Sequence, residues 1–85
     1  MIKIEYSRRF LKSFEKLPIS IPKKTIRKDK VFHQNPFYSS LRTHKLKGEF
    51  KNYWSYSVDE NYRVLFRFID KNRVIYFDIG THDIY

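Results

Sequence analysis

The apolar residues near the N-terminus follow first the period of a strand and then that of a helix. Residues 2–6 alternate between apolar and charged or polar side chains, as in a strand with one buried face. Ser7 is a favourable N-cap, and the apolar residues after it recur at helical spacing until Pro18. These residues are Phe10, Leu11, Phe14 and Leu17. The pattern predicts a short strand followed by a helix that ends before Pro18.

A second helix is predicted from the next stretch of the chain. It begins between Ser20 and Pro22, because proline is tolerated in a first turn, and it runs to about Gln34, before Asn35 and Pro36. Its apolar pattern is weaker, and the chief candidates for burial are Ile26, Val31 and Phe32. Two helices joined by a short loop that contains proline predict a helical hairpin.

From Arg42 onward the pattern is typical of strands, which we expect at about 43–48, 52–58, 62–69 and 73–80. Turn-prone residues separate the last three strands, at 59–61 and at 71–72, so these strands are expected to be antiparallel neighbours. The fold class predicted for residues 1–85 is α+β in a single domain. An N-terminal strand and a helical hairpin precede a mainly antiparallel, twisted sheet that packs on the helices.

The turn lengths predict the register of the sheet. A three-residue turn places Ser57 opposite Arg63, and a two-residue turn at Lys71-Asn72 places Arg63 opposite Gly80. Because side chains alternate between the faces of a sheet, the register divides them into two sets. The predicted core face holds Trp54, Tyr56, Val58, Val64, Phe66, Phe68, Ile75, Phe77 and Ile79. The predicted polar face holds Tyr53, Ser55, Ser57, Arg63, Leu65, Arg67, Tyr76, Asp78 and Gly80.

Charge is distributed unevenly along the chain. The net charge is +9, and the first 51 residues contain fourteen basic and four acidic residues, whereas the remainder is nearly neutral. A hydrophobic content of 41% excludes a disordered basic tail. The excess of positive charge predicts a polyanionic partner, although any single lysine is explained equally well by a solvated helix face. The cations predicted to contact such a partner are Lys45, Lys47, Lys51, Arg67, Arg8, Arg9, Lys12, Lys23, Lys24 and Arg27.

Other chemistries find little support in the composition. The chain contains no cysteine, which excludes disulfides, thiolate nucleophiles and cysteine zinc sites. Its three histidines have no clustered carboxylates near them in sequence, so we expect no metal and no cofactor. No apolar stretch approaches 18 residues, and the N-terminus has no long apolar segment. We therefore expect a soluble, cytoplasmic protein without membrane contact.

The predicted polar face collects groups suited to RNA cleavage without a metal. Arg63 opposite Gly80 places His82 near the guanidinium, and the segment 44–47 and Tyr85 are expected to converge on the same face. Such cleavage needs a group that removes the 2′-hydroxyl proton, a donor for the leaving 5′-oxygen and a cation that stabilises the transition state. Arginine binds phosphate through two N–H groups, and histidine suits either proton transfer.

Each of these residues also has a structural explanation. Arg63 pairs with Asp78 or Glu60 in one interpretation, and Asp78 is a salt-bridge partner of Arg67 in another. Isolated histidines such as His44 and His82 are commonly surface or cap residues. Tyr85 is the last residue of the chain, where fraying is common.

The ordered set of motifs resembles the RelE/ParE toxin superfamily over essentially the whole chain. The resemblance rests on residues 44–48 (HKLKG), 53–58 (YWSYSV), 62–66 (YRVLF) and 80–85 (GTHDIY). It is strongest toward the RelE-like mRNA interferases, including the YoeB and YafQ branches. This resemblance implies the RelE-like microbial RNase fold and the toxin of a type II toxin–antitoxin pair.

The resemblance also implies an activity and roles for individual residues. Such toxins cleave mRNA in the ribosomal A site by attack of the 2′-oxygen, without metal. His44 is at the position of a proposed general base, and Arg63 matches an arginine that stabilises the phosphate. His82 matches a histidine proposed for proton transfer, Tyr85 matches a C-terminal aromatic ring, and Lys47 lies in the basic segment. The order of the residues leaves open which of the two histidines is the base.

The resemblance further implies three partners: a cognate antitoxin, the 70S ribosome with mRNA in its A site, and operator DNA that the toxin–antitoxin complex binds through the antitoxin. The sequence departs from the family pattern at Ser57, where some relatives have a second arginine or a histidine, and at Asn61, where the YafQ branch has an aspartate. Two alternatives remain: a ParE-like poison of DNA gyrase and a non-catalytic RNA-binding module.

Overall fold

Two α-helices and five strands, together with three short 3-10 helices, make up the protein in a computed structural model that describes residues 1–84. Tyr85 lies outside the described residues. The α-helices are α1 (Arg8–Glu15) and α2 (Ile21–Gln34). The strands are β1 (Lys3–Tyr6), β2 (His44–Lys45), β3 (Trp54–Ser57), β4 (Arg63–Asp70) and β5 (Arg73–Gly80). The 3-10 helices are η1 (Ser39–Leu41), η2 (Gly48–Phe50) and η3 (His82–Ile84).

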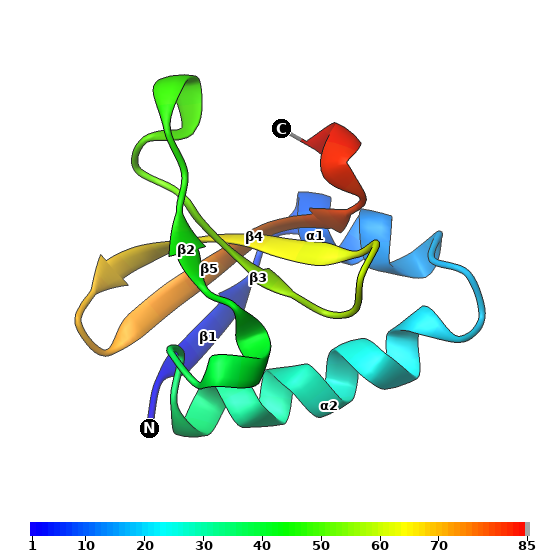
Figure 1. The fold of residues 1–85 in the computed structure, drawn as a ribbon, viewed down its shortest axis with the longest axis horizontal. Helices are drawn as coiled ribbons and strands as arrows, with labels where there is room; N and C mark the ends of the chain where they lie inside the picture. The colour runs from blue at the N-terminus through cyan, green and yellow to red at the C-terminus, as the bar shows by residue number, and fades with distance from the viewer. Residues whose placement is uncertain (85) are drawn as a thin grey trace.

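All five strands form one sheet of order β1-β5-β4-β3-β2, in which only the β1–β5 pair is parallel. Helix α2 runs along one face, whereas η2 and the C-terminal η3 project on the other side (Figure 1). The predicted fold class and both helices are therefore confirmed. Strand β2 is shorter than predicted, because the chain turns at Gly48, which has a positive φ of 68°.

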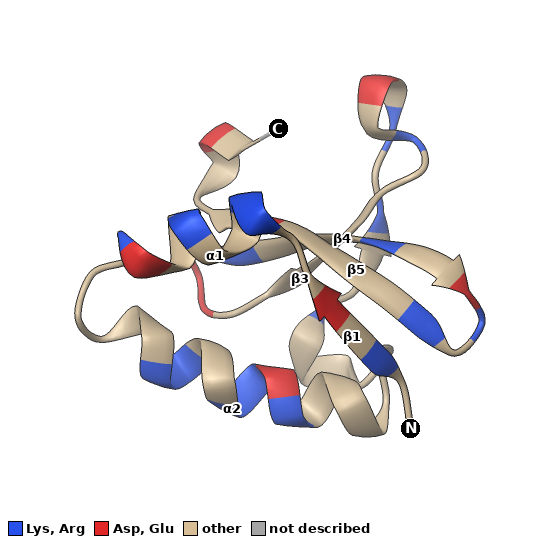
Figure 2. Ribbon diagram, turned by 180° about the vertical axis from the view of Figure 1, so that it is seen from behind, with Lys and Arg blue, Asp and Glu red and all other residues tan. Residues whose placement is uncertain are grey.

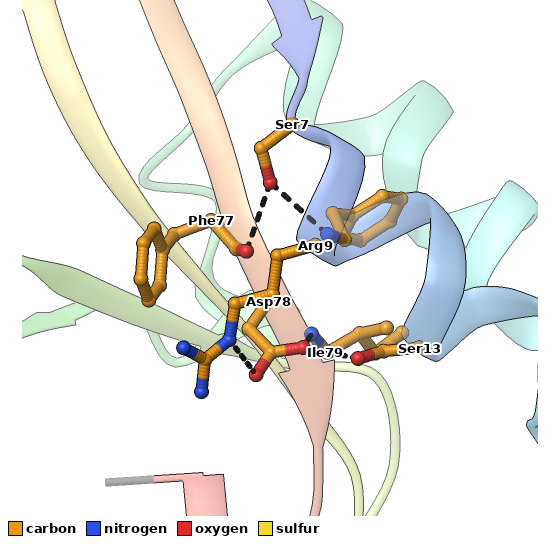
Figure 3. Close-up of polar contacts among 7 residues, drawn as sticks. Ser7, Arg9, Ser13, Phe77, Asp78 and Ile79 are labelled. Carbon is orange, nitrogen blue, oxygen red and sulfur yellow. Dashed lines mark hydrogen bonds and ion pairs between the residues drawn. The ribbon is translucent and has the colours of Figure 1, made fainter.

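The predicted N-cap of α1 also connects the helix to the sheet. The Ser7 hydroxyl accepts a 3.0 Å hydrogen bond from the Phe10 amide and donates a 2.9 Å hydrogen bond to the Phe77 carbonyl (Figure 3). One side chain thereby satisfies a free amide of the first helical turn and holds α1 against β5.

The core lies between α2 and the sheet and is largely aromatic. Phe32 of α2 is completely buried, and its ring centroid lies 4.9 Å from that of Phe66 and 5.1 Å from that of Tyr56. Ile26 was predicted to be buried, and this is wrong, because its side chain is 52% exposed. At about 100° per residue Ile26 lies roughly 140° around the helix from buried Ile21, which is the solvent side.

Thr25 takes the inward position that the sequence pattern did not predict. It is 3% exposed, and its hydroxyl donates a 2.9 Å hydrogen bond to the Ile21 carbonyl within the helix. A threonine is tolerated there because its one polar group is satisfied locally. Leu11 of α1, which follows the apolar pattern, is nevertheless 49% exposed.

The predicted β3–β4 register is confirmed, and the predicted β4–β5 register is right at both ends of the hairpin, where residues 63–65 lie opposite 78–80 and Asp70 lies opposite Arg73. Irregularities after Leu65 and after Phe68 shift the pairs between them by one residue, so that Phe66 lies opposite Tyr76. The core therefore contains Tyr76 and Val74, both completely buried. The predictions that Ile75 and Phe77 belong to the core, and that Tyr76 belongs to the polar face, are wrong because bulges change the facing of residues.

A second interaction between α2 and the sheet is polar. Asp29 of α2 accepts hydrogen bonds from the hydroxyl of Tyr76 at 2.8 Å and from that of Tyr6 at 3.1 Å. Tyr76 also shares a 2.9 Å hydrogen bond with the hydroxyl of Tyr56. Burial raises the pKa of Tyr6 to about 12 and raises the pKa values of Tyr56 and Tyr76 above their usual range, while the Asp29 charge acts in the same direction.

Candidate functional site

The face of the sheet opposite α2 carries one row of residues from four strands. His44 of β2 pairs with Ser55, Ser55 with Leu65, and Leu65 with Asp78 of β5. Ser55 and Leu65 are 1% and 0% exposed, whereas His44 is exposed. The middle of the predicted polar face therefore consists of buried residues, and the exposed His44 imidazole lies at the β2 edge of the sheet.

The neighbouring row contains the candidate cation. Ser57 pairs with Arg63, and Arg63 pairs with Gly80, as the turn lengths predict. Arg63 is partly buried, and η3 begins with exposed His82, two residues beyond Gly80. Since neighbouring strands are about 4.8 Å apart, β2 and β4 are separated by roughly 10 Å. Across this face the order is thus His44, Arg63, His82.

Gly80 allows the chain to fold back at this point. A Cβ atom at this position would overlap the Cγ2 atom of Ile84, a flexible side chain that would have to move. The missing side chain therefore leaves room for η3 to lie close to the end of β5.

The His44 ring is held by the backbone that precedes it. Its Nδ1 atom lies 3.0 Å from the carbonyl oxygen of Arg42. Arg42 has φ 51° and ψ 41°, a left-handed conformation. A hollow of about 260 Å³ beside it is lined by residues that include Arg42, Ser57 and Lys28. The hollow is also lined by Asp59 and Glu60, so its lining carries charges of both signs.

Asp78, at the other end of the first row, is held by α1. Its carboxylate accepts a 2.6 Å hydrogen bond from the Ser13 hydroxyl, a 3.1 Å hydrogen bond from Arg9 Nε and a 2.8 Å hydrogen bond from the Ile79 amide (Figure 3). The Asp78 side chain is 5% exposed and that of Arg9 is 60% exposed. The prediction that Asp78 pairs with Arg67 is therefore wrong, because α1 brings a closer cation and a hydroxyl to the carboxylate.

Arg9 also covers an aromatic ring on this face. Its guanidinium carbon lies 4.9 Å from the centroid of Phe77, which packs edge to face against Tyr53 at 5.2 Å. Sequence reasoning placed Arg9 among exposed RNA-binding cations and missed this role. Helical periodicity shows that Arg9 is outside the core, and it cannot show that a carboxylate 69 residues away lies within reach.

The predicted RNA-binding cations lie on several surfaces. Lys45 pairs with Trp54 and so faces the side of the sheet opposite His44. Lys47 and Lys51 flank η2 and are exposed, and exposed Arg67 lies on the His44 side, opposite Ile75. The remaining exposed cations are Arg8 and Lys12 on α1 and Lys23, Lys24 and Arg27 on α2.

Helix α2 and its cations lie on the other side of the sheet from His44 and Arg63. Figure 2 shows lysine and arginine spread along both helices with few acidic residues between them. Lys24 forms an ion pair with Asp59 at 3.3 Å. The structure thus places basic residues around the molecule, with His44 and Arg63 on the face of the sheet opposite α2 and His82 at the start of η3. The predicted site residue Tyr85 is outside the described residues.

Two further features bear on the class of protein. Among residues 1–84 no group of three or more histidine, cysteine, aspartate or glutamate side chains is arranged to hold a metal ion. Within that same part of the chain, no helix has the length and apolar character required to span a bilayer.

Solved structures with the same fold include toxins and toxin–antitoxin complexes. The YoeB/ParE toxin from Agrobacterium tumefaciens superposes with a TM-score of 0.77 at 18% identity, over 95% of this chain and 99% of that one. YafQ from E. coli superposes with a TM-score of 0.77 at 18% identity, over 99% of this chain and 97% of that one. A chain of the RelBE2 toxin–antitoxin complex from Mycobacterium tuberculosis superposes with a TM-score of 0.78 at 19% identity, over 95% of this chain and 98% of that one.

The architecture is therefore the small α+β fold that these structures share. More particularly, the chain has the fold of the RelE/ParE superfamily, in agreement with the resemblance of its motifs. No protein-family model matches the sequence, and no curated protein does so either.

Proposed function

We propose that the protein is the toxin of a type II toxin–antitoxin system, a ribosome-dependent endoribonuclease that cleaves mRNA in the A site and so inhibits translation. The observation that carries this proposal is the order of His44, Arg63 and His82 across one face of the sheet. A cation between two imidazoles is an arrangement suited to the attack of one oxygen on phosphorus and the departure of another.

The proposed reaction needs no metal. The 2′-oxygen of the mRNA attacks the adjacent phosphorus, and its proton passes to one histidine. The bond from phosphorus to the 5′-oxygen breaks, and the other histidine gives a proton to the leaving oxygen. The products are a 2′,3′-cyclic phosphate and a 5′-hydroxyl. Arg63 stabilises the negative charge that develops on the phosphate oxygens, and Tyr85 is proposed to add an aromatic ring to the site.

Binding to the ribosome is assigned to the exposed cations named above. A protein of net charge +9 is attracted to rRNA, and lysine and arginine contacts with phosphates displace counterions. The presence of basic residues on both sides of the sheet suits a particle that surrounds the protein. Association with ribosomes places the proposed site of action in the cytoplasm.

A protein partner is also proposed. The solved structures that share this fold include the RelBE2, YoeB–YefM and DinJ–YafQ complexes. By analogy a cognate antitoxin binds this chain and blocks the face that carries Arg63, and the complex binds operator DNA through the antitoxin. This analogy rests on the fold, and the face itself is defined by the residues of this chain.

The experiment that tests the function adds the protein to a purified translation system and maps the 5′ ends of the mRNA. We expect cleavage within the codon in the A site, new 5′-hydroxyl ends and undiminished activity in the presence of a chelator selective for transition metals. An Arg63→Ala variant is the matched control for contaminating nucleases. Intact mRNA with accumulation of gyrase-cleaved DNA would show a gyrase poison instead, and RNA binding without cleavage of either would show a non-catalytic module.

A further inference from the structure

Arg42 has an unusual backbone conformation next to the candidate site. It is the one non-glycine residue with a positive φ among residues 1–84. The left-handed region is unfavourable for a residue with a side chain. Arg42 ends η1, and its amide donates a 3.2 Å hydrogen bond to the Ser39 carbonyl. A cap of this kind is ordinarily glycine or asparagine, so the conformation is imposed by what surrounds it.

The residues on both sides of Arg42 are held in place. Leu41 is completely buried, and the Thr43 hydroxyl donates a hydrogen bond to the Pro36 carbonyl. His44 pairs with Ser55 at the edge of the sheet. The chain must therefore turn from the core to β2 within one residue, and the left-handed turn of Arg42 achieves this.

The turn directs the Arg42 carbonyl at the His44 ring. The oxygen lies 3.0 Å from Nδ1. A carbonyl oxygen has no hydrogen to donate, so Nδ1 must carry the proton of this hydrogen bond. In the neutral ring Nε2 then has a free lone pair, because neutral imidazole carries one N–H.

We propose that Arg42 is a positioning residue that acts through its backbone, by holding His44 as the Nδ1–H tautomer so that Nε2 is the general base. This inference rests on the proposed function, and it assigns the two proton transfers. His44 Nε2 takes the 2′-hydroxyl proton while the bond between the 2′-oxygen and phosphorus forms. The bond to the 5′-oxygen breaks, and that oxygen takes its proton from protonated His82.

The side chain of Arg42 is not part of this role. What the position requires is tolerance of a positive φ, which glycine has without cost and which asparagine has at low cost. A β-branched residue such as valine is strongly disfavoured there. Glycine and valine substitutions both remove the guanidinium, so a comparison between them isolates the backbone from the charge.

The first test measures the tautomer directly. The protein is labelled with ¹⁵N in its histidines and studied by NMR at about pH 8.5, where an ordinary imidazole is neutral. We expect His44 to show a protonated Nδ1 and an unprotonated Nε2, whereas a free histidine side chain in water favours the opposite form. A His44 ring that carries its proton mainly on Nε2 would overturn the inference. This readout does not depend on any RNA cleavage.

The second test compares Arg42→Gly with Arg42→Val on programmed ribosomes in single-turnover reactions. We expect the valine variant to cleave at least ~10-fold more slowly than the glycine variant and to lose the Nδ1–H signature of His44. Arg42→Asn should resemble Arg42→Gly, which keeps the comparison available if the valine variant does not fold. Equal rates for the glycine and valine variants, or an asparagine variant as slow as valine, would refute the role of the backbone. A wild-type protein that cleaves no mRNA would refute the proposed function, while the NMR result would still decide the tautomer.

Discussion

The carboxylate of Asp78 in β5 accepts a 2.6 Å hydrogen bond from the hydroxyl of Ser13 in α1, 65 residues earlier in the chain. Arg9 of the same helix contributes an ion pair at 3.1 Å. The carboxylate thereby joins the first helix to the last strand directly before Gly80 and His82. Its environment affects how firmly the end of β5, and with it the candidate site, is held.

Replacement of Asp78 by alanine is expected to lower the free energy of unfolding by about 2–3 kcal/mol, because the partly buried Ser13 hydroxyl and the buried Ile79 amide lose their acceptor. Arg9→Ala should cost less than about 1 kcal/mol, since the Arg9 side chain is 60% exposed and its charge is hydrated. Chemical denaturation of the two variants measures the difference. An equal loss of unfolding free energy in the two variants would mean that the ion pair with Arg9, and not the hydrogen bonds from the Ser13 hydroxyl and the Ile79 amide, accounts for most of the Asp78 contribution.

Two serines of this region should respond oppositely to the loss of their hydroxyl groups. Ser55 is 1% exposed, and within residues 1–84 its hydroxyl has no hydrogen-bond partner. Because an unsatisfied buried hydroxyl is unfavourable, Ser55→Ala should leave the stability unchanged or raise it by up to about 1 kcal/mol. The matched change Ser13→Ala should lower the free energy of unfolding by about 1 kcal/mol. Denaturation curves that show Ser55→Ala clearly destabilised would reveal a partner for this hydroxyl.

Alkaline pH should destabilise the protein through the tyrosines that surround Asp29. The pKa of Tyr6 is raised to about 12 and the pKa values of Tyr56 and Tyr76 are raised further, mainly by burial. The unfolded chain releases these protons first, near pH 10, so the contribution of these tyrosines to the unfolding free energy is constant below that pH and falls as the pH rises through it. We expect a shallower fall for Tyr6→Phe, measured by denaturation between about pH 9 and 11. An identical slope in both proteins would count against the raised pKa of Tyr6.

The chemical step should depend on the groups at the centre of the candidate site. Arg63→Ala and His82→Ala are each expected to lower the single-turnover cleavage rate by at least ~10²-fold, as removal of a charge-stabilising or proton-transfer group does. Arg73→Ala is the matched control, because Arg73 is an exposed arginine at the other end of the β4–β5 hairpin, paired with Asp70 at 2.9 Å. Near-wild-type cleavage by either test variant would remove that residue from the site.

Binding to the ribosome should weaken steeply with salt. Combined alanine substitution of Lys23, Lys24 and Arg27 is expected to make the dependence of log affinity on log salt less steep, by roughly 0.7–0.9 for each phosphate that the variant no longer neutralises. A second triple variant, at Lys3, Lys71 and Arg73, removes the same net charge from the end of the β4–β5 hairpin. Sedimentation with ribosomes over a range of salt concentrations compares the two. An equal change in both variants would mean that net charge, and not the α2 surface, controls binding.

Local signals were sufficient for much of this molecule. The Ser7 cap and the apolar spacing after it predict α1, and the turns at 59–61 and 71–72 set Arg63 opposite both Ser57 and Gly80. The pairing of Arg63 with Gly80 also needs the two irregularities in the β4–β5 hairpin, which offset each other. Such predictions succeed because caps and short turns depend on a few neighbouring residues.

Predictions failed where contacts with distant segments determine which side of a strand or helix a residue faces and which residue it pairs with. Strict alternation placed Phe77 in the core, but a bulge turns Tyr76 inward, where its ring packs near Phe10 and Phe32 and its hydroxyl reaches Asp29. Alternation also cannot show that Arg9 of α1 reaches Asp78. These contacts form only between segments that are far apart in the chain, so the periodicity of the sequence does not reveal them.

The sequence by itself determined the order of the elements, the ends of the helices and the pairing of Arg63 with Ser57, since each depends on residues close together in the chain. Arg63 lies opposite Gly80 as predicted only because the two irregularities between this pair and the turn offset each other. Tertiary structure alone decided which β5 residues enter the core, that α1 holds Asp78, and that the Arg42 carbonyl meets the His44 ring. These relationships depend on how packed segments fix backbone direction, because a bulge or a left-handed residue persists only where its surroundings offset its cost.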